Sequence, residues 1–327
     1  MNVKKKISTA FDEIKSIRQK QKNDQINKEQ DKTEEFTEEQ DTAKTIDYNY
    51  FIHPQDKAAQ HALQTIPGFD TAVKYYLKLC DEQEMHGINM ASKIRLGPNQ
   101  LPNIYQLLPE TCSVLGISEP EFYLEMDPNP NAYTFGDTNP FIVINSGLVE
   151  LLHQDELKTV IAHECGHILC HHVLYHSMAM TLLNIGTSIS CLNATSSAQA
   201  IKKIIGGLAS QALIPLVWAL LYWMRRSELS ADRVAAYVMG SSESVIRTMM
   251  RLSGGSARIT DQVNMKLYEQ QIEDYLSLLD ESKFNQVLQA WAIKDKSHPL
   301  PGIRCHEIRK WFAENSGVLI PATKPTI

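Results

Sequence analysis

The residues best suited to chemistry lie together in the segment His163-Glu164-Cys165-Gly166-His167. Residues four apart share one face of an α-helix, so the two imidazoles point the same way and the intervening Glu164 faces the same cleft. Two imidazoles at this spacing are typical zinc ligands, and a carboxylate between them can act as a general base. The segment therefore predicts a zinc site on a helix, with His163 and His167 as ligands.

A zinc ion in a catalytic site needs a third protein ligand and keeps its fourth position for water. His171 is near in sequence, but on a straight helix it would lie about 12 Å along the axis from His163, whereas Zn–N bonds measure about 2.1 Å. Glu228, within Ser227-Glu-Leu-Ser-Ala-Asp232, is the better candidate. Asp232 follows one helical turn later, where its carboxylate can accept the Nδ1–H of a ligand histidine. We expect one zinc ion per chain.

Both motifs belong to a set of short segments that are spread over the chain. The set consists of Ile66-Pro-Gly-Phe-Asp70, Asn131-Ala-Tyr-Thr-Phe-Gly136, Phe141-Ile-Val-Ile-Asn-Ser-Gly147, Ile161-Ala-His-Glu-Cys-Gly-His-Ile168, Ser227-Glu-Leu-Ser-Ala-Asp232 and Ser297-His-Pro299. Together these segments resemble the HtpX and CAAX-prenyl-protease family of gluzincin zinc metalloendopeptidases. The resemblance implies a zincin-like fold that hydrolyses peptide bonds.

The same resemblance implies a role for each motif residue. It makes His163, His167 and Glu228 the zinc ligands, Glu164 the catalytic base and Asp232 the carboxylate that supports a ligand histidine. Zinc would polarise the peptide carbonyl and lower the pKa of its water towards about 7. Glu164 would take the proton of that water and later pass it to the leaving amine.

Two further parts of the site rest on the resemblance. It places His298 and Arg304 near the scissile carbonyl, where they would stabilise the developing oxyanion. From the residues alone, an alternative stays open in which His298 ends a helix before a proline and Arg304 is a surface charge. The resemblance also makes Asn131, Ala132 and Tyr133 part of an edge strand beside which an extended polypeptide substrate pairs.

Two functional hypotheses follow from these motifs. The first is a zinc-dependent endopeptidase in protein quality control or regulated proteolysis. The second is a catalytically silent, zinc-containing binding or chaperone-like module. The intact Glu164 favours the first hypothesis, and a purely structural zinc site would prefer four protein ligands. Cys165 lacks a neighbouring base that would activate it, so we expect it to pack in the core.

The elements that must position these residues are mainly helical. Residues 122–126, 132–135 and 141–144 are short apolar runs separated by turn-forming segments, which predicts a small antiparallel meander. A helix capped by Asp155 should carry the histidine motif. A helical hairpin over residues 177–224 would then separate the two metal motifs. The predicted fold class is mainly α with a small antiparallel β-sheet (α+β), with a zincin-like core.

Composition sets the limits of this interpretation. The chain has 327 residues, of which 43% are hydrophobic and 21% charged, so it can bury a core and is not wholly disordered. Its net charge of -6, without a basic and aromatic cluster, argues against nucleic acid as a partner. Residues 1–48 are dominated by charged and amide side chains, which predicts a disordered tail and leaves residues 49–327 as the peptidase domain.

The cellular location is predicted from the cysteines, the first residues of the sequence and one apolar segment. Six cysteines without a CxxC pair and a polar N-terminal sequence predict a cytoplasmic protein without a signal peptide. Residues 204–224 carry no charge and would form about 30 Å of helix, enough to span a bilayer. Gly206, Gly207 and Pro215 argue against a span. Both a membrane-associated hairpin and a buried or lid-like helical pair stay open, so contact with a membrane surface or bilayer stays open too.

Overall fold

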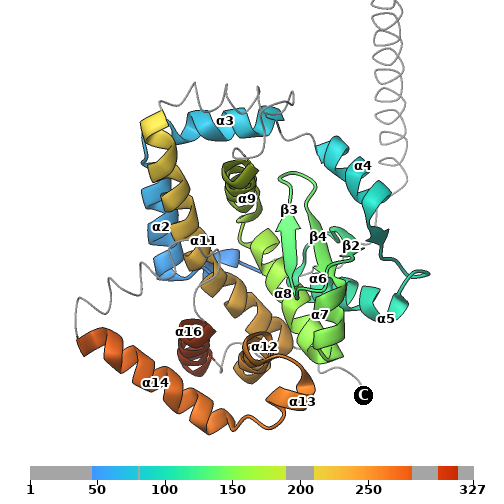
Figure 1. Ribbon diagram of the computed structural model, residues 1–327, viewed down its shortest axis with the longest axis vertical. Helices are drawn as coiled ribbons and strands as arrows, with labels where there is room; N and C mark the ends of the chain where they lie inside the picture. Colours follow the sequence, from blue (N-terminus) through green and yellow to red (C-terminus); the bar gives the residue numbers. More distant parts are fainter. Residues whose placement is uncertain (1–45, 80–81, 189–209, 282–300, 316–327) are drawn as a thin grey trace, which may run out of the picture. The chain divides into compact units, whose positions relative to one another are not determined.

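The fold is described from a computed structural model of the chain. It covers residues 46–79, 82–188, 210–281 and 301–315, which belong to one compact unit, residues 46–327 (Figure 1). Nearly all of the predicted tail, and His298 with it, lies outside the described residues. The domain boundary drawn at residue 48 therefore stays a prediction.

A four-stranded mixed sheet stands beside the helices that carry the chemistry. Its strands, in the spatial order β1-β2-β4-β3, are β1 (Ile94–Arg95), β2 (Glu121–Glu125), β3 (Ala132–Phe135) and β4 (Phe141–Asn145). The mainly helical α+β class is confirmed. The meander is wrong in detail, because β2 and β4 pair in parallel while β3 and β4 form an antiparallel hairpin. All five residues of β4 are buried, so this strand takes the centre and β3 becomes an edge.

The two faces of the sheet pack on different partners. Ile142 and Ile144 of β4 face the main core, which includes α6 (Leu107–Leu115), whereas Phe141 and Val143 face Met85 of α4 (Glu82–Ser92). Because side chains alternate along a strand, the register of β3 on β4 places Ala132 and Thr134 on the same face as Ile142 and Ile144. The histidine-bearing helix packs on β3 from this side.

That helix is α8 (Gln154–Leu169), and its start differs from the expectation. Its N-cap is His153, whose backbone N–H donates to the Glu156 carboxylate at 2.9 Å in a capping box. Asp155 lies within the first turn, so its predicted role as N-cap is wrong. The acidic residue three positions after His153 completes the box, and this fixes the start earlier in the chain.

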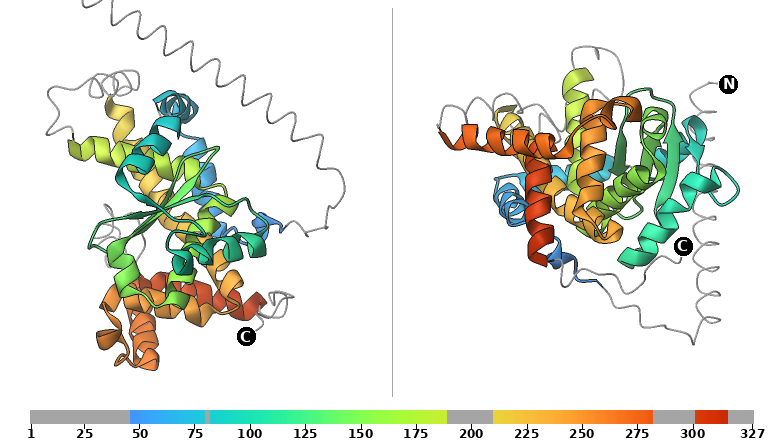
Figure 2. Two further views of the ribbon diagram at one scale, coloured as in Figure 1. Left: turned by 90° about the vertical axis from the view of Figure 1, so that its right-hand side faces the viewer. Right: turned by 90° about the horizontal axis from the view of Figure 1, so that it is seen from below.

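Helix α11 (Ser210–Met239) is a single helix of 30 residues and crosses α8 at close range (Figures 1 and 2). Gly166 makes the close approach possible. A Cβ at this position would meet Ala231 Cα and Val234 Cβ at 3.0 Å, a close contact that the neighbouring atoms would have to relieve by moving a few tenths of an ångström. The crossing brings the histidine motif on α8 close to the acidic motif on α11.

The apolar run before the acidic motif is largely packed inside the protein. Leu216, Leu220, Trp223 and Met224 of α11 are buried in a second core with side chains of three helices: α2 (Pro54–Gln64), α3 (Phe69–Leu79) and α9 (Val173–Ser188). Within the described ranges, no helix is long and apolar enough to cross a bilayer. Residues 204–209 of the candidate span fall outside those ranges.

The remaining helices lie mainly around the C-terminal half of α11. Helix α16 (Pro301–Asn315) packs against α11 and α12 (Ser242–Gly254), and so brings Arg304 to the acidic motif. The other helices not yet named are η1 (Tyr48–Tyr50), α5 (Pro102–Tyr105), α7 (Ser146–Leu151), α13 (Ala257–Thr260) and α14 (Met265–Glu281).

Candidate active site

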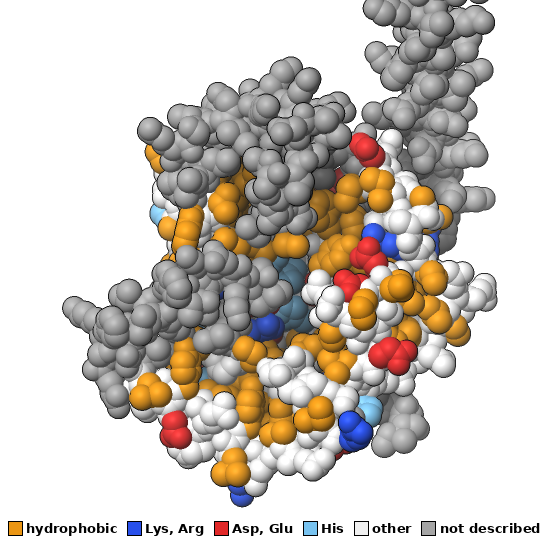
Figure 3. Space-filling model, viewed as in Figure 1, with side chains coloured by type: hydrophobic (Ala, Val, Ile, Leu, Met, Phe, Trp, Pro, Cys, Tyr) orange, Lys and Arg blue, Asp and Glu red, His pale blue; other side chains and the backbone are white. Residues whose placement is uncertain are grey.

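The crossing of α8 and α11 brings the three predicted ligands together. The Nε2 atoms of His163 and His167 lie 3.2 Å apart, and the Glu228 carboxylate lies 3.4 Å from the first and 3.3 Å from the second. All three side chains are buried. In Figure 3, histidine surface forms the base of a hollow whose visible rim is largely hydrophobic.

These distances fit a tetrahedral metal ion. Ligand atoms about 2.1 Å from zinc at tetrahedral angles are about 3.4 Å from one another. The three observed separations are close to this value, with Oε2 of Glu228 nearer to His163 and Oε1 nearer to His167. The two imidazoles and the carboxylate thus surround one position that a metal ion can take. The residues present therefore fit a zinc ion with a fourth position for water or substrate.

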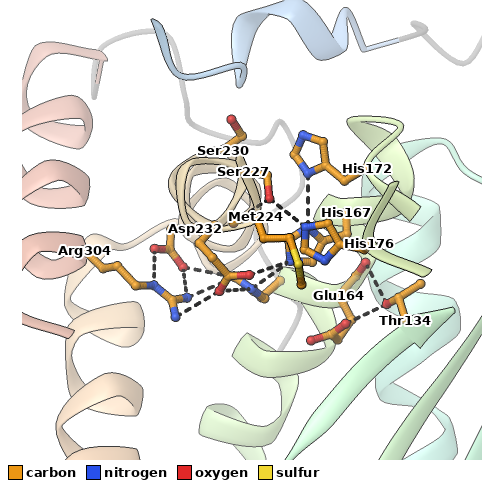
Figure 4. A network of polar contacts seen from close by, with 12 residues as sticks. Thr134, Glu164, His167, His172, His176, Met224, Ser227, Ser230, Asp232 and Arg304 are labelled. Atoms are coloured by element: carbon orange, nitrogen blue, oxygen red, sulfur yellow. Dashed lines mark hydrogen bonds and ion pairs between the residues drawn. The ribbon is translucent and has the colours of Figure 1, made fainter. Parts of the chain in front are cut away.

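His163 is held on its other side by a charged pair. Its Nδ1 donates to Asp232 at 3.0 Å, and the Arg304 guanidinium donates to both oxygens of the same carboxylate at 2.6 and 2.8 Å (Figure 4). Arg304 also pairs with Glu228 at 3.1 Å. Asp232 thus orients the ligand ring while Arg304 compensates the charge of two buried carboxylates.

His167 is held in a different way, through a second imidazole. Its Nδ1 lies 3.1 Å from Nδ1 of His172, and Nε2 of His172 lies 3.0 Å from the Asp56 carboxylate. Asp56 also accepts hydrogen bonds from the Trp223 indole and the Ser230 hydroxyl. If Nε2 of His167 binds a metal, Nδ1–H must donate to His172, which then donates to Asp56. One arrangement of protons satisfies the whole chain.

A turn at the end of α8 places His172 beneath His167. His171 adopts a left-handed backbone with φ of 58°, and the N–H of His172 bonds back to the carbonyl of His167 at 2.9 Å. This is a Schellman-type helix end, here with histidine at the left-handed position. His171 itself contacts Tyr48 and stays outside the metal group, as the spacing argument predicts.

The titration of the two ligands differs because their surroundings differ. Burial lowers the pKa of His163, but the negative Glu228 and Asp232 outweigh it and raise the pKa to about 10. Burial dominates at His167 and lowers its pKa. Burial raises the pKa of Asp232, but Arg304 and His163 overcome this and keep it below its usual value. A metal ion that binds His163 must therefore displace a proton.

Glu164 faces the same cleft from α8, and Thr134 of β3 orients it. The Thr134 hydroxyl donates to one carboxylate oxygen of Glu164 at 2.6 Å (Figure 4). This contact follows from the strand register that turns Thr134 toward α8. One oxygen of Glu164 is thus held by Thr134, and within the described residues the other makes no hydrogen bond and can accept one from a water molecule.

The predicted substrate strand is β3 together with the residue before it. Asn131 and Ala132 line a cavity of about 400 Å³ with His163 and Glu164. The Tyr133 side chain points to the opposite face, where its hydroxyl donates to Glu125. In the described part of the chain only one edge of β3 is paired with a strand, so its other edge presents backbone groups.

Sequence reasoning missed three residues of this site: Asp56, His172 and Thr134. Asp56 lies on α2, far from either motif in sequence, and His172 follows the helix end, where helical spacing no longer applies. A hydroxyl on the inward face of a strand is the one signal that could have identified Thr134. His176, which lies 2.7 Å from the Ser227 hydroxyl, also belongs to this buried group.

Cys165 lies in the core, as expected. It is fully buried in the main cluster. A hydrogen bond with Cys112 and burial both raise the pKa of its thiol well above the usual value. A thiol in this state is a packing residue.

The crossing helices, with a histidine pair and a glutamate on one side and an acidic motif on the other, define a metallopeptidase. Comparison with known proteins agrees with this class. The model described as "Peptidase family M48" matches residues 98–312. The chain therefore belongs to peptidase family M48 and is a metalloprotease that acts on polypeptides.

Several curated relatives carry the corresponding names. The chain is 33% identical over 275 residues to "Plastoglobule-localized metallopeptidase 48, chloroplastic" of Arabidopsis thaliana, covering 82% of this chain and 74% of that protein. It is 33% identical over 147 residues to "Protease HtpX homolog" of Helicobacter acinonychis, covering 41% of this chain and 47% of that protein. For the HtpX homologue of Streptococcus uberis the identity is 26% over 186 residues, with 51% and 62% covered. The chain thus spans about half to three quarters of the length of these relatives.

Proposed function

We propose that this protein is a zinc-dependent endopeptidase in which His163, His167 and Glu228 bind the metal and Glu164 is the base. The observation that carries the proposal is the close approach of three donor groups beside the Glu164 carboxylate. The two Nε2 atoms lie 3.2 Å apart, and the Glu228 carboxylate lies 3.4 Å from His163 and 3.3 Å from His167. Zinc is the metal that suits two imidazoles and one carboxylate with an open fourth position.

The chemistry divides between the metal and the side chains. A zinc ion at this site supplies a Lewis acid that polarises a peptide carbonyl and makes a water molecule easier to deprotonate. Glu164 accepts the proton of the attacking water on the oxygen that Thr134 leaves available, and passes it to the leaving amine. Asp232 and His172 hold the two ligand rings in the tautomer that directs Nε2 at the metal.

Substrate binding uses the backbone of β3. An extended polypeptide that pairs with the outer edge of Asn131, Ala132 and Tyr133 places a peptide bond over the metal centre. Main-chain hydrogen bonds do not depend on side chains, so this mode accepts many sequences in extended form. Arg304 lines the cavity and carries a positive charge, which supports a role in stabilising the oxyanion. We propose that His298 stabilises the oxyanion together with Arg304.

An extended and loosely specific binding mode suits unfolded polypeptides. We therefore place the protein in quality control or regulated proteolysis. The relatives named as proteases support the proteolytic activity that this assignment requires. The Arabidopsis relative is named as plastoglobule-localized, which supports contact with a lipid surface. For this chain we propose a cytoplasmic protein that meets a membrane surface. Membrane fractionation with a salt wash tests this placement.

Zinc content and proteolysis measured on the same preparations test the proposed function. Wild type and Glu164→Gln are purified in parallel, and each is assayed on unfolded casein with and without detergent. We expect about one zinc ion in both proteins and cleavage by wild type alone. Zinc in both proteins without cleavage under any condition would instead support the silent binding module.

A further inference from the structure

The cavity at the metal centre extends well beyond the metal ligands. It runs between α8 and α12, and its walls there are aliphatic or carry short hydroxyl groups. Leu148, Val245 and Met249 are buried, and Leu252 at the mouth is 45% exposed. The other lining residues of this part include Val160, Ala235, Thr159, Thr248 and Ser253.

The hydroxyl groups of this part of the cavity are turned away from an incoming ligand. Thr159 donates to the carbonyl of Asp155, Thr248 to that of Ser244 and Ser253 to that of Met249, each one helical turn earlier and at 2.8 to 2.9 Å. A hydroxyl whose proton is engaged in this way offers a weak acceptor and no donor. The walls are therefore apolar in effect.

Charge is confined to one end of the same cavity. The ionisable residues that line it are His163, Glu164, Glu228, Asp232 and Arg304, and all of them belong to the metal centre. A charged or amide side chain placed at the other end would lose its water without gaining a partner, which is costly. An aliphatic or aromatic side chain there would bury apolar surface, which is favourable.

From this arrangement we propose that the part of the cavity between α8 and α12 is the specificity pocket of the enzyme. It takes a large apolar side chain of the residue beside the scissile bond, and Val245, Met249 and Leu252 of α12 select that side chain. The inference rests on the proposed function, because it assumes that a peptide bond lies at the metal. It adds a side-chain preference to the backbone pairing along β3.

Binding of small metal-directed probes tests the pocket without turnover. We would measure the affinity of zinc-loaded wild type and Glu164→Gln for three peptide hydroxamates that differ in one side chain: isobutyl, methyl or carboxymethyl. The isobutyl probe should bind at least about tenfold more tightly than the methyl probe, because it buries three more carbon atoms. The carboxymethyl probe should bind most weakly of the three.

Two variants connect the preference to α12. Val245→Phe fills the pocket and should reverse the order of the isobutyl and methyl probes. Leu252→Asp changes a residue that is 45% exposed, so we expect it to fold, and it should weaken isobutyl binding about fivefold or more. Leu267→Asp on α14 is the matched control, since Leu267 is 68% exposed and does not line the cavity. It should bind all three probes as wild type does.

Cleavage-site mapping on unfolded casein gives the second measurement. Cleavage should concentrate beside Leu, Ile, Met, Val or Phe, with the enrichment at one of the two flanking positions. Cleavage without such enrichment, or equal binding of all probes, would overturn the pocket and leave the proposed function standing. An isobutyl preference lost in Leu252→Asp, together with no cleavage by wild type, would support the pocket and reject the endopeptidase.

Discussion

The two histidine ligands are alike in type and burial, but the protein supports them by different means. Behind His163 stands a charged pair, Asp232 and Arg304, which also touches Glu228 and lines the cavity. Behind His167 stands a second imidazole, His172, backed by the buried Asp56. The first support belongs to the open side of the site and the second to the core.

The difference separates two tasks. The charged support must neutralise two buried carboxylates as well as orient a ring, so its loss should affect both the fold and the metal. The support behind His167 orients a ring and ties it to α2 through Asp56, with Trp223 and Ser230 as further donors. Its loss should affect metal affinity more than folding.

The largest effect is expected for Asp232→Ala. The substitution leaves Arg304 and His163 without their shared acceptor in a buried place, which should lower the free energy of unfolding by about 3–5 kcal/mol. Zinc affinity should fall about 100-fold. Urea unfolding of the metal-free protein and titration in zinc buffers measure the two quantities. A loss of affinity without a loss of stability would contradict the double task of this carboxylate.

A smaller effect on folding is expected for His172→Phe. A phenyl ring replaces the imidazole, so the site stays filled, but the Nδ1–H of His167 loses its acceptor. One buried, unpaired group should lower the free energy of unfolding by about 1–3 kcal/mol. Zinc affinity should fall about 10- to 100-fold. The same two measurements apply. If His172→Phe cost as much stability as Asp232→Ala, the two supports would not differ as proposed.

The Asp56 carboxylate should make the free energy of unfolding depend on pH. Burial raises its pKa, but hydrogen bonds from His172, Ser230 and Trp223 hold the pKa below its ordinary value. A depressed folded-state pKa gives stability that is present above about pH 4 and is lost as the pH falls through the folded-state pKa. Asp56→Asn should cost about 1–2 kcal/mol at pH 7.

Acidification should then narrow the difference in stability between wild type and Asp56→Asn, because only wild type loses this contribution. Urea unfolding of the metal-free proteins from pH 7 to pH 3 tests the expectation, and removing zinc prevents its release from obscuring the result. A difference that stayed constant or widened below pH 4 would show that the carboxylate is not stabilised in the way described.

The smallest effect is expected outside both supports, at Thr134. Thr134→Val keeps the shape but removes the hydroxyl that holds Glu164, which should lower kcat about fivefold, equivalent to one hydrogen bond of about 1 kcal/mol. Zinc affinity should be unchanged. Thr134→Ser restores the hydroxyl and should recover most of the rate. A drop in zinc affinity would mean that Thr134 acts on the metal ligands instead of on the base.

The parts of the site that follow local geometry were predictable, and those that depend on tertiary contacts were not. The spacing of His163 and His167 is imposed by the helical repeat, and a carboxylate one turn from another indicated Glu228 and Asp232. Asp56 has no such local relation to the motifs, and the Schellman turn that returns His172 to His167 is not marked by the glycine that usually signals it.

The sheet shows the same division between local and distant information. The three runs of apolar residues were recognised as strands because alternation and turns are local signals. Their order was not, because the turns around β3 fit either a meander or an inserted hairpin. The deciding feature is the burial of β4 on both faces, which places it beside β2. The two-residue strand β1 is too short to produce a pattern.

Gly166 has no side-chain group to bind a metal, yet its position is constrained by the packing of two helices. Because a Cβ there would press on Ala231 and Val234, a side chain would push α11 outward by a few tenths of an ångström, and Glu228 is carried on that helix. Its neighbour Cys165 occupies ordinary core space, which other small apolar residues could fill. Within the five-residue motif, then, tolerance to mutation should be set by the distance between two helix axes as much as by the identity of the donor atoms.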